Sequence, residues 1–186
     1  MSRFVRRDTP IDGVMLLERA RLGDDRGFLT RLFCAEELAE AGWQGPVAQV
    51  NETGTGKAGT VRGMHFQLPP FAETKLVTCV SGTVLDVAID LREKSPTFLK
   101  HFAVELSGEN ARSLLIPQGF AHGFQTLTDD VRMIYLHSAP FRAEVEAGLH
   151  AADPALAIDW PLPVSNLSVR DQSHPLLSPE YRGVAA

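Results

Sequence analysis

Residues 61–90 read VRGMHFQLPPFAETKLVTCVSGTVLDVAID, with a histidine followed by two strand-like runs. Alternate residues of a strand share a face, so the run after Lys75 and the run from Thr83 to Asp90 are typical of β-strands. His65, Lys75 and Asp86 are ionisable residues in this strand-forming stretch. Burying a lysine and an aspartate is costly unless each has a partner, so we expect Lys75 and Asp86 to pair across neighbouring strands of a functional site. The alternative is an ordinary cross-strand ion pair.

Length and composition are typical of a soluble globular protein. The 186 residues, 44% hydrophobic and 22% charged, suffice for one domain (residues 1–186) with a full core. The net charge of −5 argues against general nucleic-acid binding, which favours a basic surface. No apolar run approaches the roughly 20 residues of a membrane span, and no signal peptide is recognisable. Cys34 and Cys79 make no disulfide framework, so we expect a cytoplasmic protein. From its charge and the lack of a long apolar run, we expect neither nucleic-acid nor membrane partners.

The remainder of the chain favours an all-β architecture. We expect strands at residues 14–20, 28–33, 47–52, 61–67, 75–80, 83–91, 101–107, 112–116, 121–127 and 131–138. Residues 35–41 predict a short helix that ends at Gly42, and residues 53–59 predict a flexible loop. The N-terminal arm, residues 1–10, is suited to adding an edge strand, and residues 153–186 predict an ordered C-terminal wrap. Many short strands at this spacing indicate a sandwich or barrel.

A second motif narrows the fold. Residues 116–123 read IPQGFAHG, and this Pro-x-Gly-x-x-His pattern resembles the second motif of cupin jelly rolls, whose histidine is often a metal ligand. The first cupin motif supplies His-x-His and a glutamate, whereas this chain has His65-Phe66-Gln67 and Lys75. An ammonium group is not a metal ligand and repels a divalent cation. We therefore expect a cupin, or double-stranded β-helix jelly roll, with short peripheral helices and without a metal.

Acid–base chemistry explains these residues without a metal. Removing a proton beside a ketone needs a base and a group that holds the developing oxyanion. His65 suits the base at neutral pH, and Lys75 suits the oxyanion with Asp86 holding it in place. Tyr135 is suited to deliver a proton to the opposite face. Taken singly, each has a structural alternative: a strand histidine, an ion pair, or a core tyrosine with a satisfied hydroxyl.

Motifs spread over roughly residues 10–175 resemble the dTDP-4-dehydrorhamnose 3,5-epimerase family. The resemblance implies a cupin that uses no metal or cofactor, forms homodimers that exchange N-terminal strands, and epimerises a nucleotide-linked 4-keto-6-deoxyhexose at carbons 3 and 5. The stretches that carry it are Asp25–Phe28, Gln49–Asn51, Arg62–Gln67, Lys75–Val77, Leu85–Arg92, Ser95–Thr97, Ile116–Phe124, Asp153–Pro154, Ile158–Pro161 and Leu167–Asp171.

The resemblance also implies individual roles. His65 would be the base, oriented by Asp171, and Tyr135 the acid on the far face of the sugar. Lys75, held by Asp86, would stabilise the enolate oxygen on carbon 4. The residues expected near the nucleotide sugar are Arg26, Phe28, Gln49, Asn51, Arg62, His122 and Phe141.

Some positions around the substrate depart from the family pattern. Arg31 stands where a glutamate is usual, Phe141 where a second tyrosine is usual, and Ala147 where an arginine is usual. Residues 71–74, FAET, differ from the usual residues before the lysine. These departures leave open the nucleotide, the sugar and which carbons are inverted. Two alternatives are a sugar-nucleotide 3,4-ketoisomerase, which would move the ketone, and a cupin that binds a nucleotide sugar without turnover.

Overall fold

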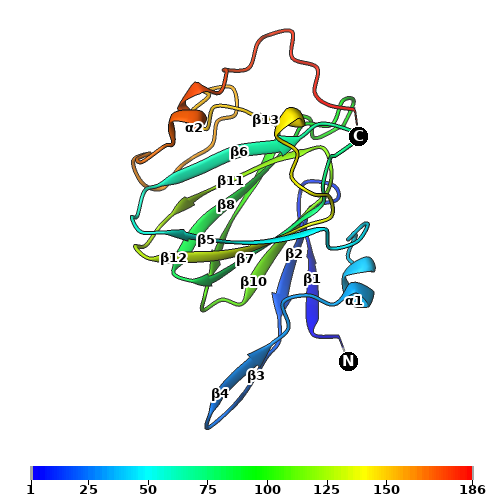
Figure 1. Ribbon diagram of the computed structural model, residues 1–186, viewed down its shortest axis with the longest axis vertical. Coiled ribbons are helices and arrows are strands. Elements are labelled where there is room, and N and C mark those ends of the chain that lie inside the picture. Colours follow the sequence, from blue (N-terminus) through cyan, green and yellow to red (C-terminus); the bar gives the residue numbers. More distant parts are fainter. Residues whose placement is uncertain (1, 186) are drawn as a thin grey trace.

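Two antiparallel sheets face each other in the computed structural model, which describes residues 2–185 (Figure 1). The first sheet has the order β1 (Phe4–Asp8), β2 (Met15–Arg19), β10 (Arg112–Ile116), β7 (Lys75–Ser81), β12 (Val131–His137) and β5 (Gln49–Thr55). The second has the order β13 (Glu146–Gly148), β6 (Val61–Gln67), β11 (Phe120–Thr126), β8 (Thr83–Asp90) and β9 (His101–Ser107). The helices are short: α1 (Ala35–Ala39), α2 (Val169–Ser173) and the 3-10 turn Ala143–Val145. This arrangement confirms the predicted all-β jelly roll.

Most expected strands form, and the strands at residues 61–67, 101–107 and 112–116 have the expected bounds. The loop expected at residues 53–59 was partly wrong, since Thr53–Thr55 continue β5. The pairing of β7 with β8 was also wrong. β7 pairs with β10 and β12, and β8 pairs with β11 and β9, so the chain crosses between the two sheets at Gly82. Lys75 and Asp86 therefore lie on opposite sheets.

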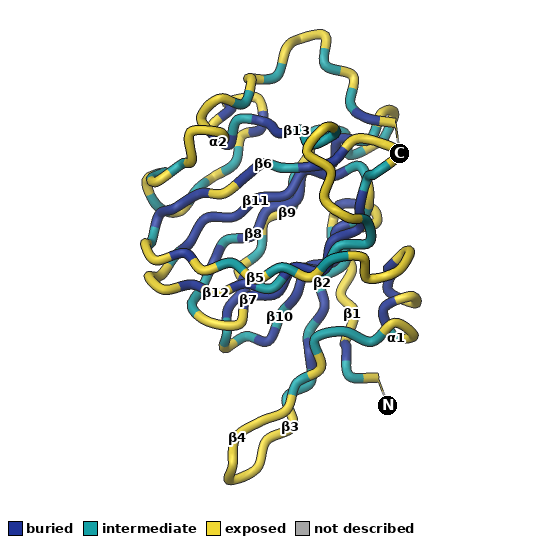
Figure 2. The backbone as a smooth tube through the Cα atoms, in the orientation of Figure 1, coloured by how far each residue is buried: buried dark blue, intermediate teal, exposed yellow. Residues whose placement is uncertain are grey.

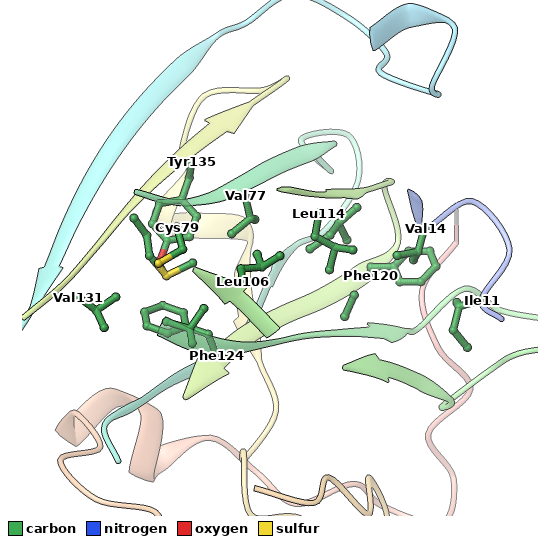
Figure 3. Packing of buried hydrophobic residues seen from close by; sticks show 14 residues of the cluster. Ile11, Val14, Val77, Cys79, Leu106, Leu114, Phe120, Phe124, Val131 and Tyr135 are labelled. Atoms are coloured by element: carbon green, nitrogen blue, oxygen red, sulfur yellow. The ribbon is translucent and has the colours of Figure 1, made fainter. Parts of the chain in front are cut away.

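Apolar residues from both sheets meet in a central core. Val77 and Leu114 of the first sheet are fully buried there and pack with Leu106, Phe120 and Phe124 of the facing sheet (Figure 3). Tyr135 belongs to the same cluster, because inward-facing residues alternate along β12 with outward-facing ones. Phe124 and Tyr135 of this central cluster also line the cavity described below.

The outer faces of both sheets are covered as well. Met64, Val87 and Ile89 on the second sheet pack under the C-terminal segment, which contributes Leu156 and the partly buried Trp160. On the first sheet, α1 and β1 cover a cluster whose members are Phe4, Leu17, Leu38, Ala41, Trp43, Leu76, Leu115 and Leu136. The C-terminal segment therefore contributes apolar side chains to the outer cluster of the second sheet, and Phe4–Asp8 of the N-terminal segment form β1, which pairs with β2 of the same chain.

A two-stranded hairpin projects from this body. It consists of β3 (Arg21–Asp24) and β4 (Gly27–Thr30), and it extends away from both sheets (Figure 1). Figure 2 shows most of it as exposed. Phe28 is 61% exposed and Leu29 is 69% exposed, which is unusual for large apolar side chains of one short hairpin. None of the helices in the described part of the chain is long and apolar enough to span a membrane.

Candidate active site

A cavity of about 590 Å³ opens between the two sheets. Side chains from β5, β6, β7, β11 and β12 line it, and α2 and the segment before β13 close one side. The polar and aromatic residues of its wall include Gln49, Asn51, Thr53, Arg62, His65, Gln67, Glu73, Lys75, His122, Tyr135, His137, Phe141, Glu146, Arg170 and Asp171. Most of the residues expected to act on or bind a substrate therefore face one hollow.

The first sheet places its polar groups through strand register. Tyr135 of β12 lies opposite Asn51 of β5, and the next inward-facing residue, His137, lies opposite Gln49. On its other side His137 lies opposite Lys75 of β7. Because inward-facing residues recur every second position, these side chains form adjacent polar rows on the wall of the cavity.

A bulge in β6 brings two of its residues to the cavity. His122 of β11 lies opposite His65, but Phe124 lies opposite Arg62, so β6 has one extra residue in this interval. Residues 62 and 65 would face opposite sides of a regular strand, and the bulge lets both line the cavity. Gly63 permits the close approach of β6 and β11 here, since a Cβ at this position would lie 2.6 Å from the Cα of Gly123.

His65 and Asp171 form a hydrogen-bonded pair. The distance from His65 Nε2 to Asp171 Oδ1 is 2.7 Å, and Asp171 is buried. Asp171 is placed by α2, whose N-cap residue Ser168 accepts a hydrogen bond from the Asp171 backbone N–H. The sequence could locate this partner only through the resemblance, because 106 positions separate the two residues.

Burial lowers the pKa of His65 to about 4, even though the hydrogen bond with Asp171 by itself raises it. Burial by itself raises the pKa of Asp171, but the contacts with His65, Ser168 and Arg170 outweigh it and the pKa is lowered overall. At neutral pH the pair is therefore a neutral imidazole beside an ionised carboxylate. An uncharged histidine is the state that a general base requires.

Arg170 approaches the same imidazole nitrogen as Asp171. Its Nη2 lies 3.2 Å from His65 Nε2, the same nitrogen that approaches Asp171. One nitrogen cannot both donate and accept, and the shorter contact to the carboxylate assigns the N–H to Nε2. The lone pair is then on Nδ1, which is the basic atom. The positive charge of Arg170 further disfavours protonation of His65.

Lys75 does not pair with Asp86, contrary to expectation. Its Nζ lies 3.1 Å from Glu73 Oε1 and donates to the backbone carbonyl of His65, also at 3.1 Å. Glu73 is itself buried and accepts a hydrogen bond from Gln67 Nε2 at 2.8 Å. The expected pairing failed because β7 and β8 belong to different sheets. Glu73 was missed, although its position two residues before Lys75 places both on one side of an extended chain.

Asp86 binds His122 instead. Asp86 Oδ2 lies 2.9 Å from His122 Nε2, and both residues are buried. The second oxygen, Oδ1, is buried without a hydrogen-bond partner among residues 2–185. His122 lines the cavity, and its ring contacts that of Tyr135 edge to face at 6.0 Å. Asp86 thus orients a histidine of the cavity wall rather than a lysine.

Tyr135 lies in the cavity wall with a mostly buried ring. Its hydroxyl accepts a hydrogen bond from Thr53 Oγ1 at 3.3 Å and approaches Met133 Sδ at 3.6 Å. Burial raises the pKa of the Tyr135 phenol, and this effect outweighs the hydrogen bond from Thr53, which by itself lowers the pKa. The negative charge of Asp86 raises the pKa further. The phenol is therefore protonated at neutral pH, the state from which an acid must start.

The expected binding residues divide into two groups. Gln49, Asn51, Arg62, His122 and Phe141 line the cavity. Gln49 donates to Asn51 Oδ1 at 3.1 Å and accepts from the Phe141 backbone, which fixes this side of the opening.

Arg26 and Phe28 are not in the cavity of their own chain, contrary to expectation. They lie on the projecting β3–β4 hairpin, where Arg26 is paired with Asp24 and the Arg21 guanidinium stacks on the Phe28 ring at 4.5 Å. The sequence motif gave their order along the chain but not the direction in which the hairpin extends.

His137 and His174, which no sequence pattern singled out, also lie at the site. His174 Nε2 is 3.8 Å from Asp171 Oδ1, and its ring contacts that of His65 edge to face at 5.6 Å. His65, Asp171 and His174 thus offer three donor atoms within 4.8 Å of one another, which suits a metal ion by distance alone. The guanidinium of Arg170, 3.2 Å from His65 Nε2, opposes a bound cation there.

Comparison with known proteins matches residues 8–179 to the family dTDP-4-dehydrorhamnose 3,5-epimerase. A relative of that name from Sinorhizobium fredii is 43% identical over 169 residues, which are 88% of this chain and 85% of the relative.

Solved structures agree with this match. The dTDP-4-dehydrorhamnose 3,5-epimerase of Bacillus anthracis, crystallised with TDP and PPi, superposes with a TM-score of 0.90 at 39% identity, covering 94% of this chain and 99% of the other. The dTDP-6-deoxy-D-glucose-3,5-epimerase of Legionella pneumophila, in complex with dTDP-4-keto-L-rhamnose, gives 0.89 at 39% identity, covering 93% and 92%.

Proposed function

Because the chain belongs to the dTDP-4-dehydrorhamnose 3,5-epimerase family, we propose that it epimerises a dTDP-linked 4-keto-6-deoxyhexose at carbons 3 and 5. The observation that carries this proposal is the neutral His65, held by Asp171 at 2.7 Å, in one cavity with Lys75 and Tyr135. The chemistry is that of an isomerase that needs no external oxidant or reductant, since each proton removed from carbon is replaced by another.

The first step is proton removal beside the ketone. Nδ1 of His65 takes the proton from the carbon next to carbon 4, and the electron pair of that C–H bond forms a carbon–carbon double bond. The π electrons of the ketone move to its oxygen, giving an enediolate. Asp171 stabilises the imidazolium that results, as a carboxylate does for a histidine that serves as a base.

The second step returns a proton to the opposite face. Lys75 holds the negative oxygen of the enediolate, and its contacts to Glu73 and to the His65 carbonyl keep the ammonium in place. The phenol of Tyr135 delivers a proton to the carbon, which inverts the configuration and restores the ketone. His65 then releases its proton to solvent and Tyr135 regains one from solvent. With both groups restored, the same two steps at the other neighbouring carbon of the ketone invert the second centre.

The remainder of the cavity suits a nucleotide sugar. Arg62, with its Nε bound to Thr55 Oγ1, and Arg170, paired with Glu146, supply positive charge for a diphosphate. Gln49 and Asn51 supply amide groups at the side of the opening where Phe141 lies. The TDP and the dTDP-sugar bound in the two related structures support this class of ligand.

We also propose a cytoplasmic homodimer. The apolar side chains of Phe28 and Leu29 on the projecting hairpin are suited to be covered by a second copy, as are parts of β1 such as the exposed Val5. In such a dimer the exposed Arg26 and Phe28 would reach the partner rather than their own cavity. Sedimentation velocity tests this: Leu29→Glu should shift a dimer toward the monomer, and a monomeric wild type would contradict it.

Solvent exchange tests the function directly. The protein is incubated with dTDP-4-keto-6-deoxyglucose in heavy water. We expect deuterium to enter carbons 3 and 5 of the sugar, and NMR measures this incorporation. His65→Ala should lower the exchange rate by about 10²–10⁴-fold, the range that general-base catalysis contributes. His150→Ala, in a histidine outside the cavity wall, is the matched control and should exchange at the wild-type rate.

Three outcomes would contradict this proposal. Absence of exchange in the wild type, with dTDP still bound in a titration, would favour a binding protein. Exchange at a carbon with migration of the ketone to carbon 3 would favour the 3,4-ketoisomerase. Undiminished exchange in His65→Ala would remove the assignment of the base.

A further inference from the structure

His137 belongs to the cavity wall but has no part in the mechanism above. It lies on the inner face of β12, two residues beyond Tyr135, and the centroids of the two rings are 6.4 Å apart. It is also directly opposite Lys75 on β7. Directly opposed residues of an antiparallel pair have Cβ atoms about 4.5–5.5 Å apart, so His137 and Lys75 line the same part of the cavity.

The protein itself leaves this imidazole poorly satisfied. Nε2 of His137 is buried and has no hydrogen-bond partner in the described range, residues 2–185. The nearby phenol of Tyr135 does not serve it, because its hydroxyl contacts Thr53 and Met133. A buried nitrogen without a partner costs free energy, so its retention in a cavity wall calls for a functional reason.

The surroundings of His137 keep it uncharged. Burial, followed by the electrostatic effects of Lys75 and His122, lowers its pKa to about 4. A neutral imidazole carries one N–H donor and one acceptor nitrogen. Such a ring can polarise a carbonyl by hydrogen bonding without surrendering its proton, a use known from other enolising enzymes.

We propose that His137 donates a hydrogen bond to the ketone oxygen on carbon 4 of the bound sugar, beside the ammonium group of Lys75. This inference rests on the proposed function. Lys75 has three N–H donors, and Glu73 and the His65 carbonyl accept two of them, so one is left for the oxygen. His137 supplies a second donor, and the two together hold the negative charge that His65 generates. No proton passes from His137 to the oxygen.

Two substitutions of His137 distinguish a role as hydrogen-bond donor from a role as a ring that only fills space. His137→Phe keeps a ring but removes the donor, and His137→Gln keeps an N–H. We expect His137→Phe to lower kcat for deuterium exchange into dTDP-4-keto-6-deoxyglucose by about 100-fold, as loss of one oxyanion donor does. The kcat of His137→Gln should be at least tenfold higher than that of His137→Phe. The affinity for dTDP, which lacks the sugar, should change less than twofold in both.

A matched control is His101→Gln on β9, outside this cavity, which should keep wild-type kcat. A kcat within threefold of wild type in His137→Phe would overturn the inference while leaving the proposed function intact. Equal losses in His137→Phe and His137→Gln together with weakened dTDP binding would also overturn it, because they would indicate a structural role. No exchange by the wild type would overturn both proposals together.

Discussion

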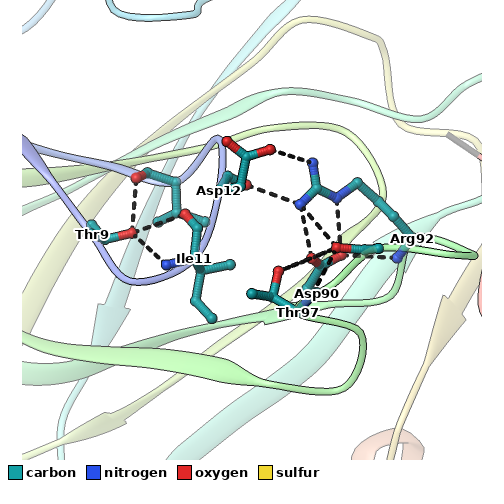
Figure 4. A network of polar contacts seen from close by, with 8 residues as sticks. Thr9, Ile11, Asp12, Asp90, Arg92 and Thr97 are labelled. Carbon is teal, nitrogen blue, oxygen red and sulfur yellow. Dashed lines mark hydrogen bonds and ion pairs between the residues drawn. The ribbon is translucent and has the colours of Figure 1, made fainter.

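Strand β8 carries two buried aspartates, Asp86 and Asp90, whose surroundings differ sharply. Both are 0% exposed, and they lie four residues apart on the same face of the strand. Asp90 accepts hydrogen bonds on both oxygens from Arg92, and from the hydroxyls of Ser95 and Thr97 (Figure 4). Arg92 also contacts the Asp12 carbonyl, so this network ties the end of β8 to the loop after β1.

Asp86 has far fewer partners. Its Oδ2 contacts His122 at 2.9 Å, and its Oδ1 is buried without a partner among residues 2–185. A fully satisfied buried carboxyl is explained by stability, whereas an incompletely satisfied one needs another reason. The difference teaches that burial alone does not separate the two aspartates, whereas the number of hydrogen-bond donors around each carboxyl does. We infer a structural role for Asp90 and a role in the site for Asp86.

The largest effect should follow from removing the better-satisfied carboxyl. Asp90→Ala leaves the guanidinium of Arg92 and two hydroxyls without their acceptor, so we expect a loss of about 3 kcal/mol in the free energy of unfolding. For a chain of this length that corresponds to a melting temperature lower by about 6–12 °C, measurable by calorimetry. Solvent exchange by the protein that remains folded should be unchanged. A shift below 2 °C would show that Asp90 is not a structural anchor.

Substitution of Asp86 should have a smaller effect on stability, in the opposite direction, and should lower the rate of exchange. Asp86→Asn keeps the shape but removes a carboxyl that the fold satisfies poorly, so the melting temperature should stay the same or rise. The hydrogen bond that orients His122 weakens, and losing about 1.5–3 kcal/mol at a charged partner corresponds to roughly 10- to 100-fold in kcat. The assay is the rate of deuterium exchange. Lost stability with normal exchange would place Asp86 in the same structural class as Asp90.

The smallest effect concerns the pH range over which His137 and Asp90 change the free energy of unfolding. The pKa of His137 is lowered from 6.5 to about 4, so between these values the unfolded chain binds a proton that the folded chain does not, and stability falls as the pH falls. Burial by itself raises the pKa of Asp90, but its donors lower it overall, so its contribution is lost only below its ordinary 3.8.

Thermal melts at intervals between pH 7 and pH 4.5 test this separation. His137→Gln should flatten the decline in melting temperature seen in the wild type, whereas Asp90→Ala should shift the whole curve downward and keep its slope. Parallel curves for wild type and His137→Gln would show that His137 does not titrate in this window.

The sequence predicted some residues of the site better than others. His65, Lys75 and Tyr135 were located from motifs and strand periodicity, and the cavity contains all three. The ionic partners were located less well: Lys75 contacts Glu73, and Asp86 contacts His122. His137 had no signal beyond its place two residues after Tyr135, which the alternation of β12 puts on the same face.

The sequence by itself determined most of the strands, the jelly-roll class, the family resemblance and the residue types available for proton transfer, because alternation and motif spacing are properties of short stretches of chain. Only the tertiary structure decided which charged groups meet, because that depends on the sheet each strand joins. A single glycine, Gly82, carries the chain from one sheet to the other and separates Lys75 from Asp86. The same long-range packing brings α2, and with it Asp171, to His65 from 106 positions away.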